Sequence, residues 1–412
     1  MENTETHNRG LLGCSVEVKG FSSFEKIEIT ADSLREASLE LGRKIKRPTV
    51  ELLSYKRKDA NFDDSLEKAS KSLQKLKDLS DKYSEVFTTP DGANHLKIYI
   101  DTLESFCEGA GITIDEGALL QIEDQAGCET LIVQNAETGE IAAIHTEEDS
   151  DEFSRSGNPA RGKRWIDMKI GEREVQFCSY AGICSWGSAS GIVQEKGRSF
   201  FQASDIIDPC VKGDLWANAV VFMFMDVANL NDIKVMAERM KGLPKPIFDS
   251  GYVVHMIEGD SKSFLTLEFG GDEVNFVDPV MSSERAIQIG DNYPRTLSLQ
   301  AIDGYNLPQQ ASETNEDYEK RQKEKWAMER RTRRLVKIGQ MAGRGRTGQW
   351  GRDNVLGIAK KVMNSPHGDV VDEWFTGLSN DLVAQHDLLY VSPEGQMSLI
   401  VRRGFPKLRS KK

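Results

Sequence analysis

Apolar and polar residues alternate along many short stretches of this chain, with the period of two that is typical of half-buried β-strands. Longer stretches repeat their apolar positions with helical spacing, and Gly, Pro, Asn and Asp mark the turns between elements. Strands are predicted at 14–18, 25–29, 128–134, 140–146, 165–170, 172–178, 191–193, 199–204, 250–257, 263–269, 274–277, 388–391 and 397–401. Helices are predicted at 34–45, 64–87, 94–108 and 315–341, and the apolar stretch at 216–240 is predicted as a buried helix or as a strand and a helix. This grouping of strands and helices indicates an α+β fold with two packed antiparallel sheets.

The hairpin at 128–146 begins with a cysteine that directly follows a glycine, Gly127-Cys128. If the chain is cut between these two residues, Cys128 carries both a thiol and a free α-amine, and the amine can take the proton of the thiol. One residue then supplies the nucleophile and its base. The alternative is that Cys128 is a small buried hydrophobe at the start of a core strand. Cys184 is a rival nucleophile, but no glycine precedes it.

The residues upstream of this junction favour the nucleophile. Phe106-Cys107-Glu108-Gly109-Ala110-Gly111-Ile112 leads through an acidic helical stretch to Gly127-Cys128. This arrangement resembles the acyl-coenzyme A:6-aminopenicillanic-acid acyltransferase group of N-terminal-nucleophile (Ntn) hydrolases, which are related to choloylglycine hydrolases and to acid-ceramidase-like amidases. In that group the precursor cleaves itself at a Gly-Cys junction. The resemblance runs from about residue 103 to the C-terminus.

The resemblance implies a fold and a division of the chain. The fold would be a four-layer αββα sandwich, two antiparallel sheets between helical layers, with Cys128 at the end of a central strand. Residues 1–127 would form a pro-segment or α-subunit, and residues 128–412 would form the hydrolase core or β-subunit. The resemblance also implies a second helix, at residues 353–363, after the charged helix at 315–341.

A second segment of the resemblance is Gln288-Ile289-Gly290-Asp291-Asn292-Tyr293-Pro294. It is similar to the segment that supplies an oxyanion-hole asparagine in this superfamily, so Asn292 would donate a hydrogen bond to the charge that develops on a carbonyl oxygen. As local sequence alone, the same residues are typical of a turn.

At the end of the hairpin the family has an Arg or His, then an Asn, then an Asp that contacts the amine of the nucleophile. Allowing one extra loop residue, the resemblance implies these positions for His145, Thr146 and Glu148, and a shift of one residue gives the last role to Asp149. The chain departs from the family at Glu129, which stands between the cysteine and Thr130. The predicted catalytic residues are therefore Cys128, Asn292 and Glu148, and the predicted substrate-binding residues are Thr130, His145, Thr146 and Asp149.

Composition narrows the class of protein. Of the 412 residues, 39% are hydrophobic and 29% are charged, as in ordinary soluble globular proteins, and the net charge of −12 argues against a general nucleic-acid binder. No apolar run approaches the ~18 residues of a membrane span. The polar residues 1–10 do not resemble a secretory signal, so we expect a cytoplasmic protein. Its six cysteines form no Cys-x-x-Cys pair and its six histidines are scattered, so we expect reduced thiols, no metal and no cofactor.

The sequence thus predicts a cysteine Ntn amidohydrolase or acyltransferase that acts on the linear amide bond of a small N-acyl substrate after self-cleavage. The alternative is a catalytically inactive protein of the same fold that binds an anionic partner through the basic cluster Arg330–Arg346. Such a run of arginines is also typical of a solvated helix face. Both readings leave a homo-oligomer open.

Overall fold

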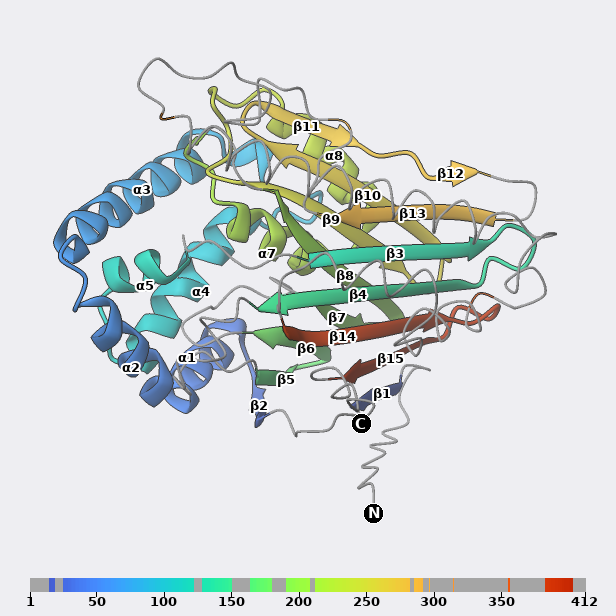
Figure 1. Cartoon of the computed structure of the whole chain (residues 1–412), viewed down its shortest axis with the longest axis horizontal. Helices are drawn as coiled ribbons and strands as arrows, with labels where there is room; N and C mark the ends of the chain where they lie inside the picture. Colours follow the sequence, from blue (N-terminus) through green and yellow to red (C-terminus); the bar gives the residue numbers. More distant parts are fainter. Residues whose placement is uncertain are drawn as a thin grey trace.

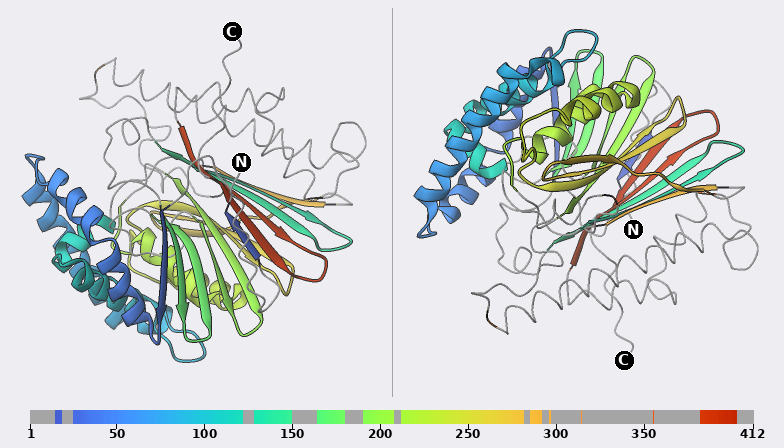
Figure 2. Two further views of the ribbon diagram at one scale, coloured as in Figure 1. Left: turned by 90° about the horizontal axis from the view of Figure 1, so that it is seen from below. Right: turned by 90° about the horizontal axis from the view of Figure 1, so that it is seen from above.

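The computed structural model describes residues 15–18, 25–121, 128–149, 164–179, 190–207, 212–281, 285–291 and 382–402, together with the single residues 296, 314 and 355. In this part of the chain, two β-sheets pack face to face and a layer of helices covers the outer face of one of them (Figures 1 and 2). The predicted α+β class with two packed sheets is confirmed.

Two sheets hold all the strands of the described residues. The first sheet has seven strands there, in the order β1 (Ser15–Val18), β15 (Met397–Arg402), β14 (Leu382–Val391), β4 (Ile141–Asp149), β3 (Cys128–Asn135), β13 (Arg285–Asp291) and β12 (Val280–Met281). The second has eight, in the order β11 (Glu273–Phe276), β10 (Ser263–Gly270), β9 (Gly251–Glu258), β8 (Arg198–Ile207), β7 (Ser190–Glu195), β6 (Arg173–Ser179), β5 (Arg164–Ile170) and β2 (Glu25–Ala31).

The sequence pattern predicted two antiparallel sheets, but each sheet also contains one parallel pair of strands. At one edge of each sheet a strand runs parallel to its neighbour, β1 to β15 and β2 to β5. Both are strands of the N-terminal segment, which therefore contributes a strand to each sheet.

The described α-helices are α1 (Leu34–Lys44), α2 (Lys46–Lys56), α3 (Phe62–Lys82), α4 (His95–Ala110), α5 (Ile114–Gln121), α7 (Ala217–Val227) and α8 (Leu230–Met240), with a short 3₁₀ helix at Ser84–Val86. The apolar stretch at 216–240 is two helices, and α7 is buried along all but its last residue. The predicted helices at 315–341 and 353–363 lie outside the described residues, apart from the buried, helical Val355. A fourth layer over the first sheet stays a prediction.

Two hydrophobic cores lie between the three described layers. One lies between the helices and the second sheet and holds large side chains such as Trp216, Phe222 and Phe177. The other lies between the sheets and includes Ile132 of β3 and Phe201 of β8. Complete burial of one such side chain contributes about 1.5–3 kcal/mol. These cores hold the strands rigidly enough to position polar side chains between the sheets.

No helix of the described part is long and apolar enough to cross a lipid bilayer.

Candidate functional site

Cys128 is the first residue of β3, a strand near the middle of the first sheet, with β4 on one side and β13 on the other. Its partner in the ladder is Glu147 of β4, and the next residue, Glu129, pairs with Asp291 at the end of β13. The prediction that Cys128 stands at the end of a central strand is confirmed.

The space between the sheets turns from apolar to polar toward the start of β3. Ile132 belongs to the inter-sheet core, whereas Thr130, two residues earlier on the same face, is buried in a hydrogen-bonded network. In the ladder of the first sheet Thr130 pairs with His145 of β4, and His145 pairs with Asp387 of β14. On its other side Thr130 pairs with Gly290 of β13. One row of four strands therefore carries these four residues side by side.

The network crosses to the second sheet through Asp205 of β8. The Thr130 hydroxyl donates to Asp205 Oδ1 at 3.0 Å, and Thr130 Oγ1 lies 2.9 Å from His145 Nδ1. His145 Nδ1 is also 3.5 Å from Asp205 Oδ1. On the far side, His255 Nε2 of β9 lies 3.1 Å from Asp205 Oδ2, and His255 Nδ1 lies 2.9 Å from the hydroxyl of Thr266. All five side chains are buried.

The hydrogen-bond partners determine which atoms of this network carry most of the protons. A hydroxyl has one hydrogen, and Thr130 gives it to Asp205, so Thr130 Oγ1 accepts from a protonated His145 Nδ1. A carboxylate only accepts, so His255 Nε2 carries a proton toward Asp205.

Desolvation by burial acts to raise the pKa of the Asp205 carboxyl, but the hydrogen bonds and charges of His145 and His255 outweigh it. The pKa therefore lies well below its ordinary value, and Asp205 is a carboxylate.

Two further contacts lie beside this polar network, between the same two sheets. The Ser190 hydroxyl of β7 donates to Asp387 Oδ2, and both residues are fully buried. Gly290 lies against the network so closely that a Cβ there would be 1.9 Å from His255 Nε2 and 2.4 Å from Asp205 Oδ2. A glycine is required at this point because the β13 backbone occupies the space of a side chain.

Of the predicted site residues, the structure brings Thr130 and His145 together. Thr146, Glu148 and Asp149 belong to β4 by their backbone, and their side chains lie outside the described part, as does that of Cys128. Asn292, Cys184 and the cluster Arg330–Arg346 also lie outside it. Their roles stay predictions.

Sequence reasoning missed the residues that come from the second sheet, Asp205, His255 and Thr266. The available signal was weak: His255 interrupts the apolar run at 252–257 of β9, and Asp205 is a buried carboxylate in β8. Buried charges are rare unless they are paired. Glu147 was also missed, although it is the register partner of Cys128.

The glycines of the segment at 106–112 have a structural role. A Cβ on Gly109 of α4 would lie 2.0 Å from the carbonyl oxygen of Leu39, and one on Gly42 of α1 would lie 2.2 Å from that of Phe106. Helices α1 and α4 thus cross with their backbones in contact. Gly111 ends α4 in the left-handed conformation, with φ of 70°.

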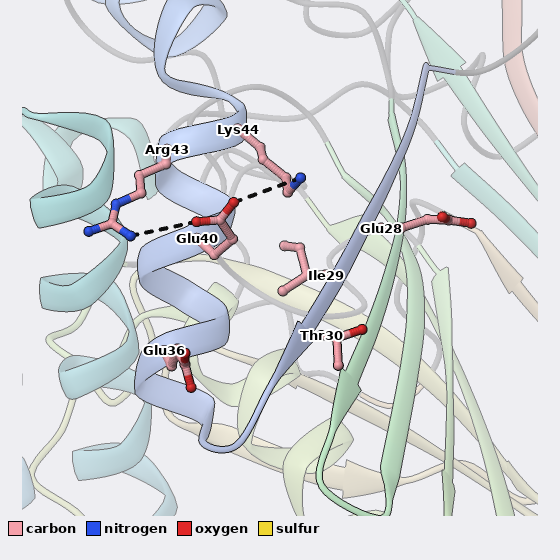
Figure 3. Close-up of a pocket in the computed structure, with 7 residues that line it drawn as sticks. All are labelled: Glu28, Ile29, Thr30, Glu36, Glu40, Arg43 and Lys44. Carbon is pink, nitrogen blue, oxygen red and sulfur yellow. Dashed lines mark ion pairs between the residues drawn. The ribbon is translucent and has the colours of Figure 1, made fainter.

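A groove of about 280 Å³ lies elsewhere, between the edge strand β2 and helix α1. Figure 3 shows the residues that line it. Its lining is mainly charged, and Glu40 pairs there with Arg43 at 3.6 Å and with Lys44 at 3.7 Å. These are exposed pairs one helical turn apart, which contribute little energy. The groove has no part of the polar network.

No group of His, Cys, Asp and Glu residues in the described part is arranged to hold a metal ion. Neither a scan against protein-family models nor a search of curated proteins finds a match to this sequence.

Proposed function

We propose that the protein is a cysteine Ntn amidohydrolase or acyltransferase that acts on a linear amide bond of a small N-acyl substrate. The observation that carries the proposal is the place of Cys128, at the start of a central strand in one of two face-to-face sheets. A buried Thr130–His145–Asp205 network begins two residues further along that strand. A chain end created at this point would emerge beside polar groups and not within the apolar core.

The finer architecture of the proposal is the four-layer αββα sandwich. Three layers support it: the helices α1–α5, α7 and α8, the second sheet and the first sheet. The fourth layer would be formed by residues 315–363. The division at Gly127-Cys128 would separate a segment of 127 residues from the hydrolase core.

The chemistry follows from a free N-terminal cysteine. The α-amine takes the thiol proton, the thiolate attacks the amide carbonyl, and Asn292 with a backbone N–H holds the oxyanion. The α-amine then protonates the leaving amine, and water or a second amine accepts the acyl group from the thioester. Glu148 or Asp149 would contact the ammonium, and the ladder adds Glu147 as a third candidate because it pairs with Cys128.

The test is the state of the chain on a denaturing gel combined with N-terminal sequencing. We expect two fragments, one of which begins at Cys128, and we expect Cys128→Ala to leave a single folded, uncut chain. Cys107→Ala is the matched control, because this free thiol is buried in α4 and desolvation, with Glu104 and Glu116 nearby, raises its pKa to about 12. It should be cut like the wild type. A wild-type chain that stays intact contradicts the proposal and favours the anion-binding alternative at Arg330–Arg346.

A further inference from the structure

A further buried histidine lies in the helical layer, at the start of α4. His95 is the first residue of this helix, and both of its ring nitrogens have oxygen partners. Nδ1 lies 2.6 Å from Oδ2 of Asp226 near the end of α7, and Nε2 lies 2.7 Å from Oγ1 of Thr89. All three residues are buried. Thr89 Oγ1 also lies 2.7 Å from Oδ1 of Asp91, an exposed residue in the turn that precedes the helix.

These contacts determine which atoms carry hydrogens. A carboxylate only accepts, so Thr89 donates its single hydrogen to Asp91, and His95 Nδ1 donates to Asp226. Thr89 Oγ1 can then only accept from His95, so Nε2 carries a hydrogen as well. The carbonyl oxygen of Ala93 is another acceptor for Thr89, at 3.4 Å, but its use would leave two acceptor oxygens 2.7 Å apart. With a hydrogen on each nitrogen, the His95 ring is a positively charged imidazolium.

The carboxylates on either side compensate this charge. A cation in the first turn of a helix is unfavourable by itself, because the positive end of the helix dipole lies there. The hydrogen bonds from Thr89 and from the N–H of Ala93 lower the pKa of Asp91, and the charge of His95 acts in the same direction. Burial acts to raise the pKa of Asp226, but the hydrogen bond of His95 and the charge of Arg173 lower it. Both aspartates are therefore ionised.

The other charged groups at this site have partners of their own. Arg173 of β6 donates to Asp226 Oδ1 at 2.6 Å, and its Nε lies 3.8 Å from Oε2 of Glu195 at the end of β7. Arg239 of α8 donates to two backbone carbonyl oxygens of the segment before the turn, each at 2.9 Å. Lys97 of α4 is exposed and pairs with a carboxylate one helical turn further along. The buried side of His95 is thus fixed through Asp226 and Arg173.

We propose that the turn at 89–94 is a pH-sensitive switch, closed while the His95 ring is positively charged and open when the ring is neutral. When Nε2 loses its proton to water it becomes an acceptor, so Nε2 and Asp91 Oδ1 compete for the one hydrogen of Thr89. One of these two contacts then becomes a repulsion between acceptors. Because Asp226 is fixed, the exposed Asp91 turns to water and releases the N–H of Ala93, which donates to Asp91 Oδ1 at 3.2 Å in the closed turn. The switch does not depend on the proposed enzymatic activity.

The experiment combines nitrogen NMR of the histidine rings in the folded chain with hydrogen exchange at the amide of Ala93. At about pH 6 we expect two protonated nitrogens on His95 and a protected Ala93 amide. As the pH rises and the ring loses its proton, the protection factor of this amide should fall about tenfold, the effect of losing one hydrogen bond to a charged group. A His95 ring that is neutral at about pH 6, or one that keeps both hydrogens up to about pH 9, overturns the proposal.

Two threonine variants test the coupling between the ring and the turn. Thr89→Val keeps the shape of the side chain and removes the shared hydroxyl, so the Ala93 amide should be weakly protected at every pH, whereas Thr89→Ser should respond to pH as the wild type does. Thr88→Val is the matched control, because the Thr88 hydroxyl donates to the carbonyl oxygen of Ser84 at 2.7 Å. It should also keep the wild-type response. Protection of Ala93 that stays constant while His95 titrates in the wild type contradicts the switch, whatever the variants do.

Discussion

Asp226 is the residue that shows most clearly what a buried carboxylate does for this fold. It accepts a hydrogen bond from Arg173 Nη1 at 2.6 Å and lies 2.6 Å from His95 Nδ1, so it joins α7 to β6 and to the start of α4. Burial acts to raise the pKa of Asp226, but the hydrogen bond of His95 and the charge of Arg173 lower it below its ordinary value. The folded state therefore requires this group to be ionised.

The sign of the pH dependence follows. The pKa of Asp226 is depressed in the folded state, so its contribution to stability is complete above the unfolded value of about 3.9 and is lost as the pH falls toward the folded value. Asp205, with its lowered pKa, acts in the same direction. We expect the free energy of unfolding to fall below about pH 4, and we expect Asp226→Asn to be less stable at neutral pH but to lose less on acidification.

Urea unfolding at a series of pH values measures this difference. Breaking a buried ion pair costs about 3–5 kcal/mol, because Arg173 keeps a partly buried charge. An Asp226→Asn variant whose stability falls with acid as steeply as that of the wild type would show that this carboxylate titrates normally.

Only some residues of the polar network could be predicted from the sequence. Thr130 and His145 could be singled out because the family resemblance implies substrate-binding roles for them. Asp205 and His255 meet them from a different sheet, and 75 residues separate Asp205 from Thr130 along the chain. These contacts depend on how the two sheets pack against each other, and no local sequence pattern predicts that packing.

Among the elements, the contact between α1 and α4 is the tightest in the helical layer. The two helices approach at Gly42 and Gly109, where each would place a Cβ against a carbonyl oxygen of the other. Backbone atoms cannot rotate away as a flexible side chain can, so an added methyl group must push the helices apart.

We therefore expect Gly109→Ala to lower the free energy of unfolding by about 1–3 kcal/mol or more, although alanine is the better helix former. Lys97→Ala, on an exposed position of the same helix, is the control and should change stability little. Denaturant midpoints of the two variants decide the matter. If Gly109→Ala is as stable as Lys97→Ala, close packing does not explain the glycines of this segment.

Element prediction succeeded where periodicity was strong, but it missed α2 and β13. Helix α2 has Pro48 in its first turn. Proline is tolerated there because the first N–H groups of a helix have no partner within it. The β1–β15 and β2–β5 pairs were likewise unpredictable, since the partners lie far apart in sequence and alternation does not reveal which strands are neighbours.

For the whole molecule, the alternation of apolar and polar residues was enough to predict two packed sheets. The apolar stretch at 216–240 was predicted as a buried helix or as a strand and a helix, and it forms two helices. The place of the N-terminal segment was not predictable. The segment contributes to all three described layers, with β1 in the first sheet, β2 in the second and α1–α5 in the helical layer (Figure 1).

Because residues 1–127 contribute to every described layer, we can predict whether the two fragments separate after a cut at Gly127-Cys128. Beyond the β1–β15 and β2–β5 ladders, Trp216 Nε1 donates to Ser72 Oγ at 2.7 Å and Asn218 Nδ2 donates to the carbonyl oxygen of Gln121 at 2.5 Å. Tyr99 of α4 packs against Trp216, with ring centroids 6.3 Å apart. Departure of the segment would expose a large part of the apolar core on the second sheet, at about 25 cal/mol for each Å².

We therefore expect the fragments to behave as an α-subunit and a β-subunit that stay together, and not as a core that releases its pro-segment. On size-exclusion chromatography in native buffer, the cut wild type should elute as one species at the volume of the uncut Cys128→Ala chain. The two fragments should separate only in denaturant, because a shared core holds them and no covalent bond does. Recovery of free residues 1–127 from native buffer, with a core that remains folded, would show that the ladders and helix contacts of this segment are dispensable once the chain is cut.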